Sequence, residues 1–201
     1  RYDGELDDLS PAGRAKAVAW TQGILAELQS IDRTRLSRAN QVDAAMLDNQ
    51  LRYSLWSEQT LQDNRWNPLV YTQLSGQALY GLLAREFAPL PERLRSLTSR
   101  LEKLPTLLAQ ARTNLVPARV PSIHAETAAR QNPGLLSLVD ELVVPNLGQL
   151  PAAERARLEQ AIAAARAAVG THQQWLDKEL VPNAKGDFRI GRELFDAKLG
   201  F

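Results

Sequence analysis

The chain of 201 residues contains no cysteine, one methionine and two histidines, and aromatic residues make up 6% of it. The lack of cysteine excludes disulfides, thiolate catalysis and cysteine-ligated zinc, but it leaves the compartment open because periplasmic proteins can also lack cysteine. No apolar run approaches the roughly 18 to 20 residues that cross a bilayer, so we expect no membrane span. The chain has no signal-like opening segment and starts at Arg1 rather than Met, which favours a soluble fragment of a longer protein.

Positive and negative charges are nearly balanced, with 24 lysine and arginine residues and 23 aspartate and glutamate residues. The two signs are interleaved along the chain, whereas phosphate binding rests on clustered positive charge. We therefore expect no nucleic-acid partner. The apolar fraction of 44% is enough to bury a core without disulfides or structural metal.

Helical periodicity is present almost everywhere and strand alternation almost nowhere, which predicts an all-α fold. We expect a bundle of about seven to eight helices, several of them long and antiparallel, in a single helical domain over residues 1–201. Ser10-Pro11 is a helix start, and Pro151 opens the last long helix. The polar link 187–190 between two glycines is too short to be a domain linker.

The clearest pattern is a stripe of apolar residues at alternating steps of three and four. Such a stripe packs at a shallow angle against another long helix. Pro105 lies inside it, so we expect a kink or a break there. The stripe consists of Leu94, Leu97, Leu101, Leu104, Leu108, Ala111 and Leu115.

Two further stripes predict buried helix faces, one near the start of the chain and one near its end. The later stripe includes His172, and a histidine on an apolar stripe is typical of a packed, hydrogen-bonded side chain. The stripes consist of Ala17, Trp20, Ile24, Leu28 and Ile31, and of Leu158, Ile162, Ala165, Val169, His172 and Leu176.

The sequence offers no catalytic, cofactor-binding or metal-binding set. Neither His124 nor His172 has a partner at HExxH spacing. The carboxylates occur as adjacent or near-adjacent pairs, which on a helix point apart, so we interpret them as solvated charges or helix-end dipole partners. These pairs are Asp7 with Asp8, Asp140 with Glu141, and Asp177 with Glu179.

Four tryptophans are predicted mainly as core anchors, although large amphipathic rings also suit a ligand groove. Trp66 is the exception, because it lies in DNRWNPL, which we expect to be non-helical. Residues held in loops by proline are often functional. Trp66 is therefore a candidate surface contact.

Three segments in order, RWNPLVY, RLEKLPTLLAQARTNL and HQQWLDKELVPNAKGDFRIGRELFDAKL, resemble the amino-terminal half of a bacterial family known as domain of unknown function 885. That family is similar to zinc metallopeptidases of the HExxH type. The resemblance implies a zinc-dependent metallopeptidase or carboxypeptidase acting on peptides, with the zinc in a missing carboxy-terminal half. Arg192 and Glu193, beside the last turn, are then candidate cleft-facing residues, with a salt-bridged helix start as the alternative.

Two functions of different classes remain after this comparison of motifs. The first is a non-catalytic amino-terminal helical region that walls or caps the substrate cleft of a metallopeptidase. The alternative is a self-sufficient helical module that binds a peptide or a protein partner. An excised cleft wall would expose apolar surface and self-associate. The compartment of the bacterial protein, periplasmic, secreted or cytoplasmic, is not determined by the sequence.

Overall fold

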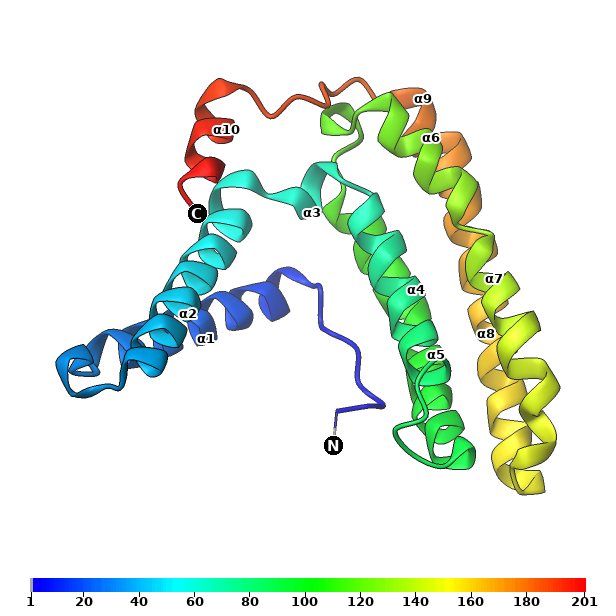
Figure 1. Ribbon diagram of the computed structural model, residues 1–201. Coiled ribbons are helices and arrows are strands. Elements are labelled where there is room, and N and C mark those ends of the chain that lie inside the picture. Colours follow the sequence, from blue (N-terminus) through cyan, green and yellow to red (C-terminus); the bar gives the residue numbers. More distant parts are fainter. Residues whose placement is uncertain (1) are drawn as a thin grey trace. The chain divides into compact units, whose positions relative to one another are not determined.

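A computed structural model describes residues 2–201 and confirms the all-α fold (Figure 1). Within these residues the only strand-like pairing that is seen is a single bridge between Pro121 and Gly186. The helices are α1 (Pro11–Ser30), α2 (Arg38–Trp56), α3 (Asp63–Trp66), α4 (Leu69–Leu83), α5 (Leu90–Asn114), α6 (Ser122–Gln131), α7 (Gly134–Leu138), α8 (Ala152–Trp175), α9 (Val181–Asn183) and α10 (Arg192–Leu199).

Contacts divide the chain into two compact units. The first contains the residues up to Asp8 together with Asn64–Phe188, and the second contains Leu9–Asp63 and Arg189–Phe201. The boundary at Phe188 falls within the link 187–190, which the sequence had suggested was too short to separate domains. A single domain over residues 1–201 stays a prediction.

In the first unit the central pair of helices, α5 and α8, runs in parallel. Arg95 pairs with Glu154 at 2.7 Å, and further along both helices Glu102 accepts two hydrogen bonds of 2.7 Å from Arg157. Because the residue numbers rise together on both helices, the helices point the same way. Between these pairs the predicted stripes of both helices are buried.

The outer pairs of this unit are antiparallel. The guanidinium of Arg93 donates to the carbonyl oxygens of Leu82 and Leu83, and that of Arg100 donates to Ala78, so α4 runs opposite to α5. In the same way Asn132 donates to the carbonyl oxygen of Val169. Asp140 forms an ion pair with Arg166, so the segment from α6 to α7 runs opposite to α8. The outer pairs of helices are therefore antiparallel, whereas the central pair, α5 and α8, is parallel.

Pro105 does not break α5, which continues through it to Asn114. Proline removes one backbone donor and crowds the preceding turn. The neighbouring side chains Leu101, Leu104 and Leu108 are nevertheless almost fully buried, so tertiary packing holds this stretch helical. The expected break is wrong, and a bend at Pro105 stays a prediction.

The second unit is built on the hairpin of α1 and α2. The Ser10 hydroxyl accepts from the Gly13 amide at 3.1 Å, which caps α1 as predicted. Its small core contains Leu28, Ala44 and Leu51. Trp20, which lies on the predicted buried stripe of α1, is 67% exposed, so that stripe is only partly covered.

The end of the chain returns to this hairpin. The ring of Phe201 lies 5.6 Å from both Tyr53 and Trp56 of α2, measured between ring centres. Gly191 precedes α10 with a φ of 83°, a left-handed conformation that favours glycine. Within the second unit, packing of Phe201 therefore holds the end of the chain against α2.

Candidate functional site

Trp66 lies at the end of α3, one helical turn, so the prediction of a non-helical stretch is wrong at this point. The side chain is half-buried, and its ring stacks on His124 of α6 with ring centres 5.9 Å apart. Asn67-Pro68 follows α3 directly, and the Asn67 side chain accepts from the Leu69 amide at 3.2 Å. This local turn leads into α4, which begins at Leu69. A surface-contact role for Trp66 stays a prediction.

Arg192 and Glu193 lie in the first turn of α10, in the second unit, and thus in a different unit from Trp66. Both side chains are exposed. The Arg192 guanidinium pairs with Asp196 one turn along at 3.4 Å. This arrangement matches the salt-bridged helix start, and a role of Arg192 and Glu193 in a cleft stays a prediction.

His172 of α8 is 6% exposed and stacks on Trp175, with ring centres 5.8 Å apart. It is packed on the stripe as predicted, but its Nδ1 atom is buried without a hydrogen-bond partner. Burial, together with the positive charge of Arg112, lowers the pKa of His172 to about 4. The imidazole is therefore neutral at pH 7.

The paired carboxylates bind to nearby side chains rather than to each other. Asp8 accepts from Gln110, Asp140 pairs with Arg166, and Asp177 accepts from Gln173. Among residues 2–201 no three histidine, cysteine, aspartate or glutamate side chains are grouped as metal ligands. The interpretation of the carboxylates as solvated charges or helix-end dipole partners stays a prediction.

An open groove of about 540 Å³ lies in the first unit between α4 and the segment from α6 to α7. The α4 wall is one helical stripe, and no side chain of the lining is charged. Such a surface offers apolar contact together with amide and hydroxyl hydrogen-bonding groups. The groove is lined by Leu69, Thr72, Gln73, Gly76, Gln77, Tyr80, Gln131, Gly134, Leu135 and Leu138.

Arg112, near the end of α5, differs from those arginines of the α5–α8 pair that form ion pairs. Its Nη1 atom is buried without a hydrogen-bond partner, and burial alone lowers the pKa of its guanidinium. By contrast, a carboxylate partner, Glu102, raises the pKa of Arg157. Arg112 is thus a partly buried cation without a counter-charge among the described residues.

Comparison with known proteins places these features in a family. The family described as "Bacterial protein of unknown function (DUF885)" matches residues 1–201. The chain belongs to the DUF885 family. No curated protein matches it.

A solved chain, described as "a putative lipoprotein of unknown function from Shewanella oneidensis", has the same fold. It is 29% identical to this chain and superposes with a TM-score of 0.90 over 98% of this chain and 36% of its own length. This DUF885 chain therefore spans about a third of the length of that relative. Within residues 2–201, none of the helices is long and apolar enough to cross a membrane.

Sequence reasoning on this DUF885 chain missed Arg112. A signal was available, because the residues three and four positions away on either side are Leu108, Ala109, Leu115 and Val116. None of them is a carboxylate that could pair with Arg112 along the helix. A cation flanking a buried stripe without such a partner is a candidate for an interaction elsewhere.

Proposed function

We propose that this chain is the amino-terminal helical region of a longer DUF885 protein that acts as a zinc-dependent metallopeptidase or carboxypeptidase on peptides. The observation that carries the proposal is the likeness to the Shewanella oneidensis chain. It extends over 98% of this chain but only 36% of that one. The motif resemblance implies that the remaining part would hold zinc and the catalytic groups.

The described residues do not themselves fit a zinc ion, since no three potential ligands are grouped among residues 2–201. The two histidines lie on different helices, and each packs against a tryptophan ring. We therefore derive no catalytic step from this chain. Its proposed role is to wall or cap a substrate cleft.

The first unit suits such a role mechanically. The parallel pair α5–α8 buries a continuous stripe of leucine and alanine and is pinned at its surface by Arg95–Glu154 and Glu102–Arg157. Close-packed interiors deform little. A wall of this kind would hold its exposed groups at fixed positions.

A second candidate is a self-sufficient binding module, and the groove of about 540 Å³ favours it. Side-chain amides of Gln73, Gln77 and Gln131 line the groove together with apolar groups. Amides can donate to and accept from a peptide backbone. The groove would thus suit an uncharged peptide segment.

The description of the Shewanella oneidensis chain as a lipoprotein supports a location outside the bacterial cytoplasm. We include this location in the proposal. Cell fractionation of the native host tests it. Recovery of the complete protein with cytoplasmic markers alone would contradict it.

The function is tested by metal analysis and a peptide-library cleavage assay on the complete protein, with the 201-residue chain alone as the comparison. We expect about one zinc per complete protein, none on the chain, and cleavage that a chelator abolishes. A reading frame beyond Phe201 without an HExxH motif would contradict the peptidase proposal.

The same measurements separate the two candidates. If the complete protein binds no zinc and cleaves no peptide, while the 201-residue chain binds library peptides, the binding module is supported. A matched variant is Gly76→Leu, because Gly76 lines the groove and an added Cβ would meet no atom within 4 Å. It should fill the groove without unfolding α4 and abolish binding by the module.

A further inference from the structure

Buried polar atoms without a hydrogen-bond partner gather at one end of the first unit. Six such side-chain atoms are found among the described residues, and four belong to Asn64, Arg112, His124 and His172. These residues lie on α3, near the end of α5, on α6 and near the end of α8, which Figure 1 shows at the same end of the unit. Unsatisfied buried polar groups are uncommon in native structures, and each requires an explanation such as a bound group or an ordered water.

Contacts between these elements bring the residues together. The Val116 amide, just after α5, donates to the carbonyl oxygen of Arg65 in α3 at 2.9 Å, and the Trp66 ring of α3 stacks on His124. Arg112 acts electrostatically on His172 across the α5–α8 pair. The parallel course of the two helices accounts for this, since Arg112 lies as far along α5 as His172 lies along α8.

The α5–α8 pair has charged groups at three successive levels. At the first two levels an arginine meets a carboxylate, in Arg95–Glu154 and in Arg157–Glu102. At the third level the charge of Arg112 acts on His172, and no described carboxylate stabilises the charge of this arginine. The Arg112 guanidinium thus lacks the carboxylate partner that the arginines of the first two levels have.

The neutral His172 limits what this level would bind. Because the only charge at this level is that of the Arg112 guanidinium, a ligand with a single negative charge balances it better than a dianionic phosphate does. The planar guanidinium can donate two parallel hydrogen bonds to a carboxylate. His172 can add a third bond by carrying its proton on Nδ1.

We propose that Arg112 and His172 form a binding site for one carboxylate group at this third level of the α5–α8 pair. The carboxylate comes from an aspartate or glutamate elsewhere in the complete protein, or from the carboxy terminus of a bound peptide. The site does not depend on the proposed peptidase activity. It is therefore tested by binding and stability rather than by turnover.

The first test measures thermal unfolding of the 201-residue chain in sodium acetate and in sodium chloride at equal ionic strength, at pH 7. Acetate should raise the unfolding midpoint by about 2–4 °C over chloride. In Arg112→Gln the shift should vanish, with binding at least about tenfold weaker. The matched variant Arg95→Gln, which removes a pair at another level, should keep the shift.

The source of the carboxylate is then identified in two arms. In the first, acetyl-Ala-Ala with a free carboxy terminus should protect the chain, and the same peptide with a terminal amide should not. In the second, carboxyl groups of the complete protein are labelled with a carbodiimide and glycine ethyl ester. If the source is internal, one aspartate or glutamate is protected in the wild type and labelled in Arg112→Gln.

The proposal is overturned if acetate equals chloride in the chain, both peptides are inert, and Arg112→Gln exposes no new carboxyl group in the complete protein. Ordered water would then satisfy Arg112 and His172. Circular dichroism shows whether Arg112→Gln is folded. If it is not, Arg112→Lys serves instead, because it keeps the charge and loses only the paired hydrogen bonds, which should weaken acetate binding without abolishing it.

Discussion

At the scale of single residues, His172 couples the stability of the first unit to pH. Its pKa falls from 6.5 to about 4 on folding, because burial and the Arg112 charge disfavour the protonated imidazole. Below pH 6.5 the unfolded chain therefore binds a proton that the folded chain does not. We expect the free energy of unfolding to decrease from pH 6.5 to 4, by at most about 3 kcal/mol from this group.

Urea denaturation at half-unit steps of pH measures this effect, with His172→Gln as the test variant. The variant should lose stability less steeply than the wild type between pH 6.5 and 4. His124→Gln is the matched control, because it removes the other histidine and leaves His172 in place. Parallel curves for the wild type and His172→Gln would show that the burial of His172 carries no pH dependence.

Gly186 is required by a close approach of two backbone segments. Its amide donates to the carbonyl oxygen of Val120, and a Cβ at this position would overlap the carbonyl group of Arg119. We expect Gly186→Ala to destabilise the first unit by about 1–3 kcal/mol, because the backbone must shift. Chemical denaturation measures the loss.

Gly170 provides the contrasting substitution. It lies inside α8, and an added Cβ would meet no atom within 4 Å. Gly170→Ala should therefore raise the free energy of unfolding by about 0.5–1 kcal/mol, since alanine favours the helix. If Gly186→Ala and Gly170→Ala changed the free energy of unfolding equally, the close backbone contact would not explain the glycine at position 186.

Single residues also show the limits of sequence reasoning about a site. Asp177 accepts from Gln173 one helical turn away, a partner that helical spacing can indicate, whereas Asp8 accepts from Gln110, 102 residues away, which the sequence does not indicate. The electrostatic effect of Arg112 on His172 does not appear in the sequence pattern. It depends on the parallel course of α5 and α8, which no periodicity within one helix records.

At the scale of elements, apolar spacing predicted the buried faces of α5 and α8 residue by residue. Every member of both stripes is buried. The same spacing on α1 predicted a buried Trp20, which is exposed. The spacing of apolar residues predicts which face of a helix is apolar. It does not predict whether another element packs on that face, because this depends on the tertiary structure.

Pro105 offers a test of how much tertiary packing supports α5. The helix continues through the proline although one backbone donor is lost there. We expect Pro105→Ala to restore that donor and to raise the free energy of unfolding by about 1–3 kcal/mol. Pro91→Ala, in the first turn of α5 where proline is well tolerated, is the control and should change stability little. Loss of stability in Pro105→Ala would indicate that packing requires the proline ring.

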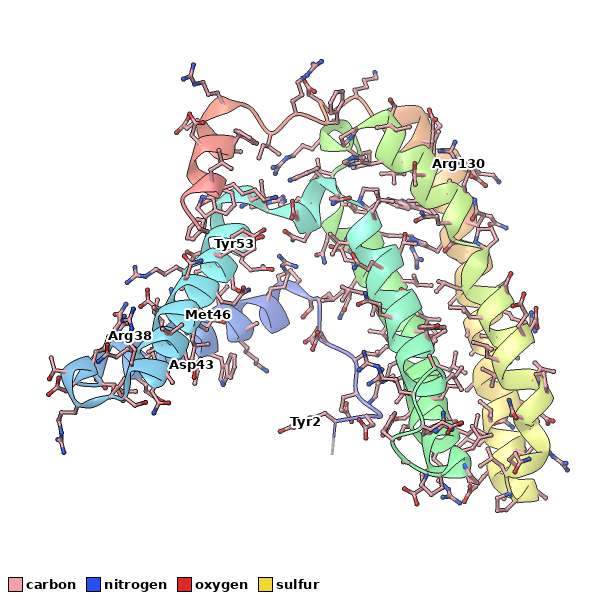
Figure 2. All side chains as sticks on the ribbon, in the orientation of Figure 1. Tyr2, Arg38, Asp43, Met46, Tyr53 and Arg130 are labelled. Atoms are coloured by element: carbon pink, nitrogen blue, oxygen red, sulfur yellow. The ribbon has the colours of Figure 1, made fainter. Side chains whose placement is uncertain are left out.

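The hairpin of α1 and α2 carries exposed apolar side chains. Trp20 of α1 and Met46 of α2 are each 67% exposed, and Figure 2 labels Met46 on its helix. Exposed apolar groups favour association, so we expect the 201-residue chain to self-associate. Sedimentation velocity should show concentration-dependent association that weakens in the double variant Trp20→Ser, Met46→Ser. A chain that is monomeric at every concentration would contradict this.

At the scale of the whole molecule, the division into two units was not visible in the sequence. The link 187–190 is short, and its residues, Asp, Phe, Arg and Ile, contain no proline or glycine that would mark a boundary. The second unit is assembled from Leu9–Asp63 and Arg189–Phe201. Such a discontinuous unit arises from long-range contacts, including those of Phe201 with Tyr53 and Trp56. Local patterns cannot predict those contacts.

Because the two units have hydrophobic cores of different size, we expect two unfolding transitions. The second unit buries few apolar side chains, namely Leu28, Ala44, Leu51 and Leu61, whereas the first buries the stripes of α5 and α8. Since buried apolar surface is the main source of stability, the second unit should melt first. Calorimetry of the 201-residue chain should show a lower and an upper transition.

Two core substitutions assign these transitions. Leu51→Ala should lower only the first midpoint, and Leu101→Ala only the second, with each leucine costing about 2–5 kcal/mol of the free energy of unfolding of its own unit. Tryptophan fluorescence is a weak probe here, because both units contain tryptophan. A single transition lowered by both substitutions would instead mean that residues 1–201 unfold as one cooperative domain, as the sequence had predicted.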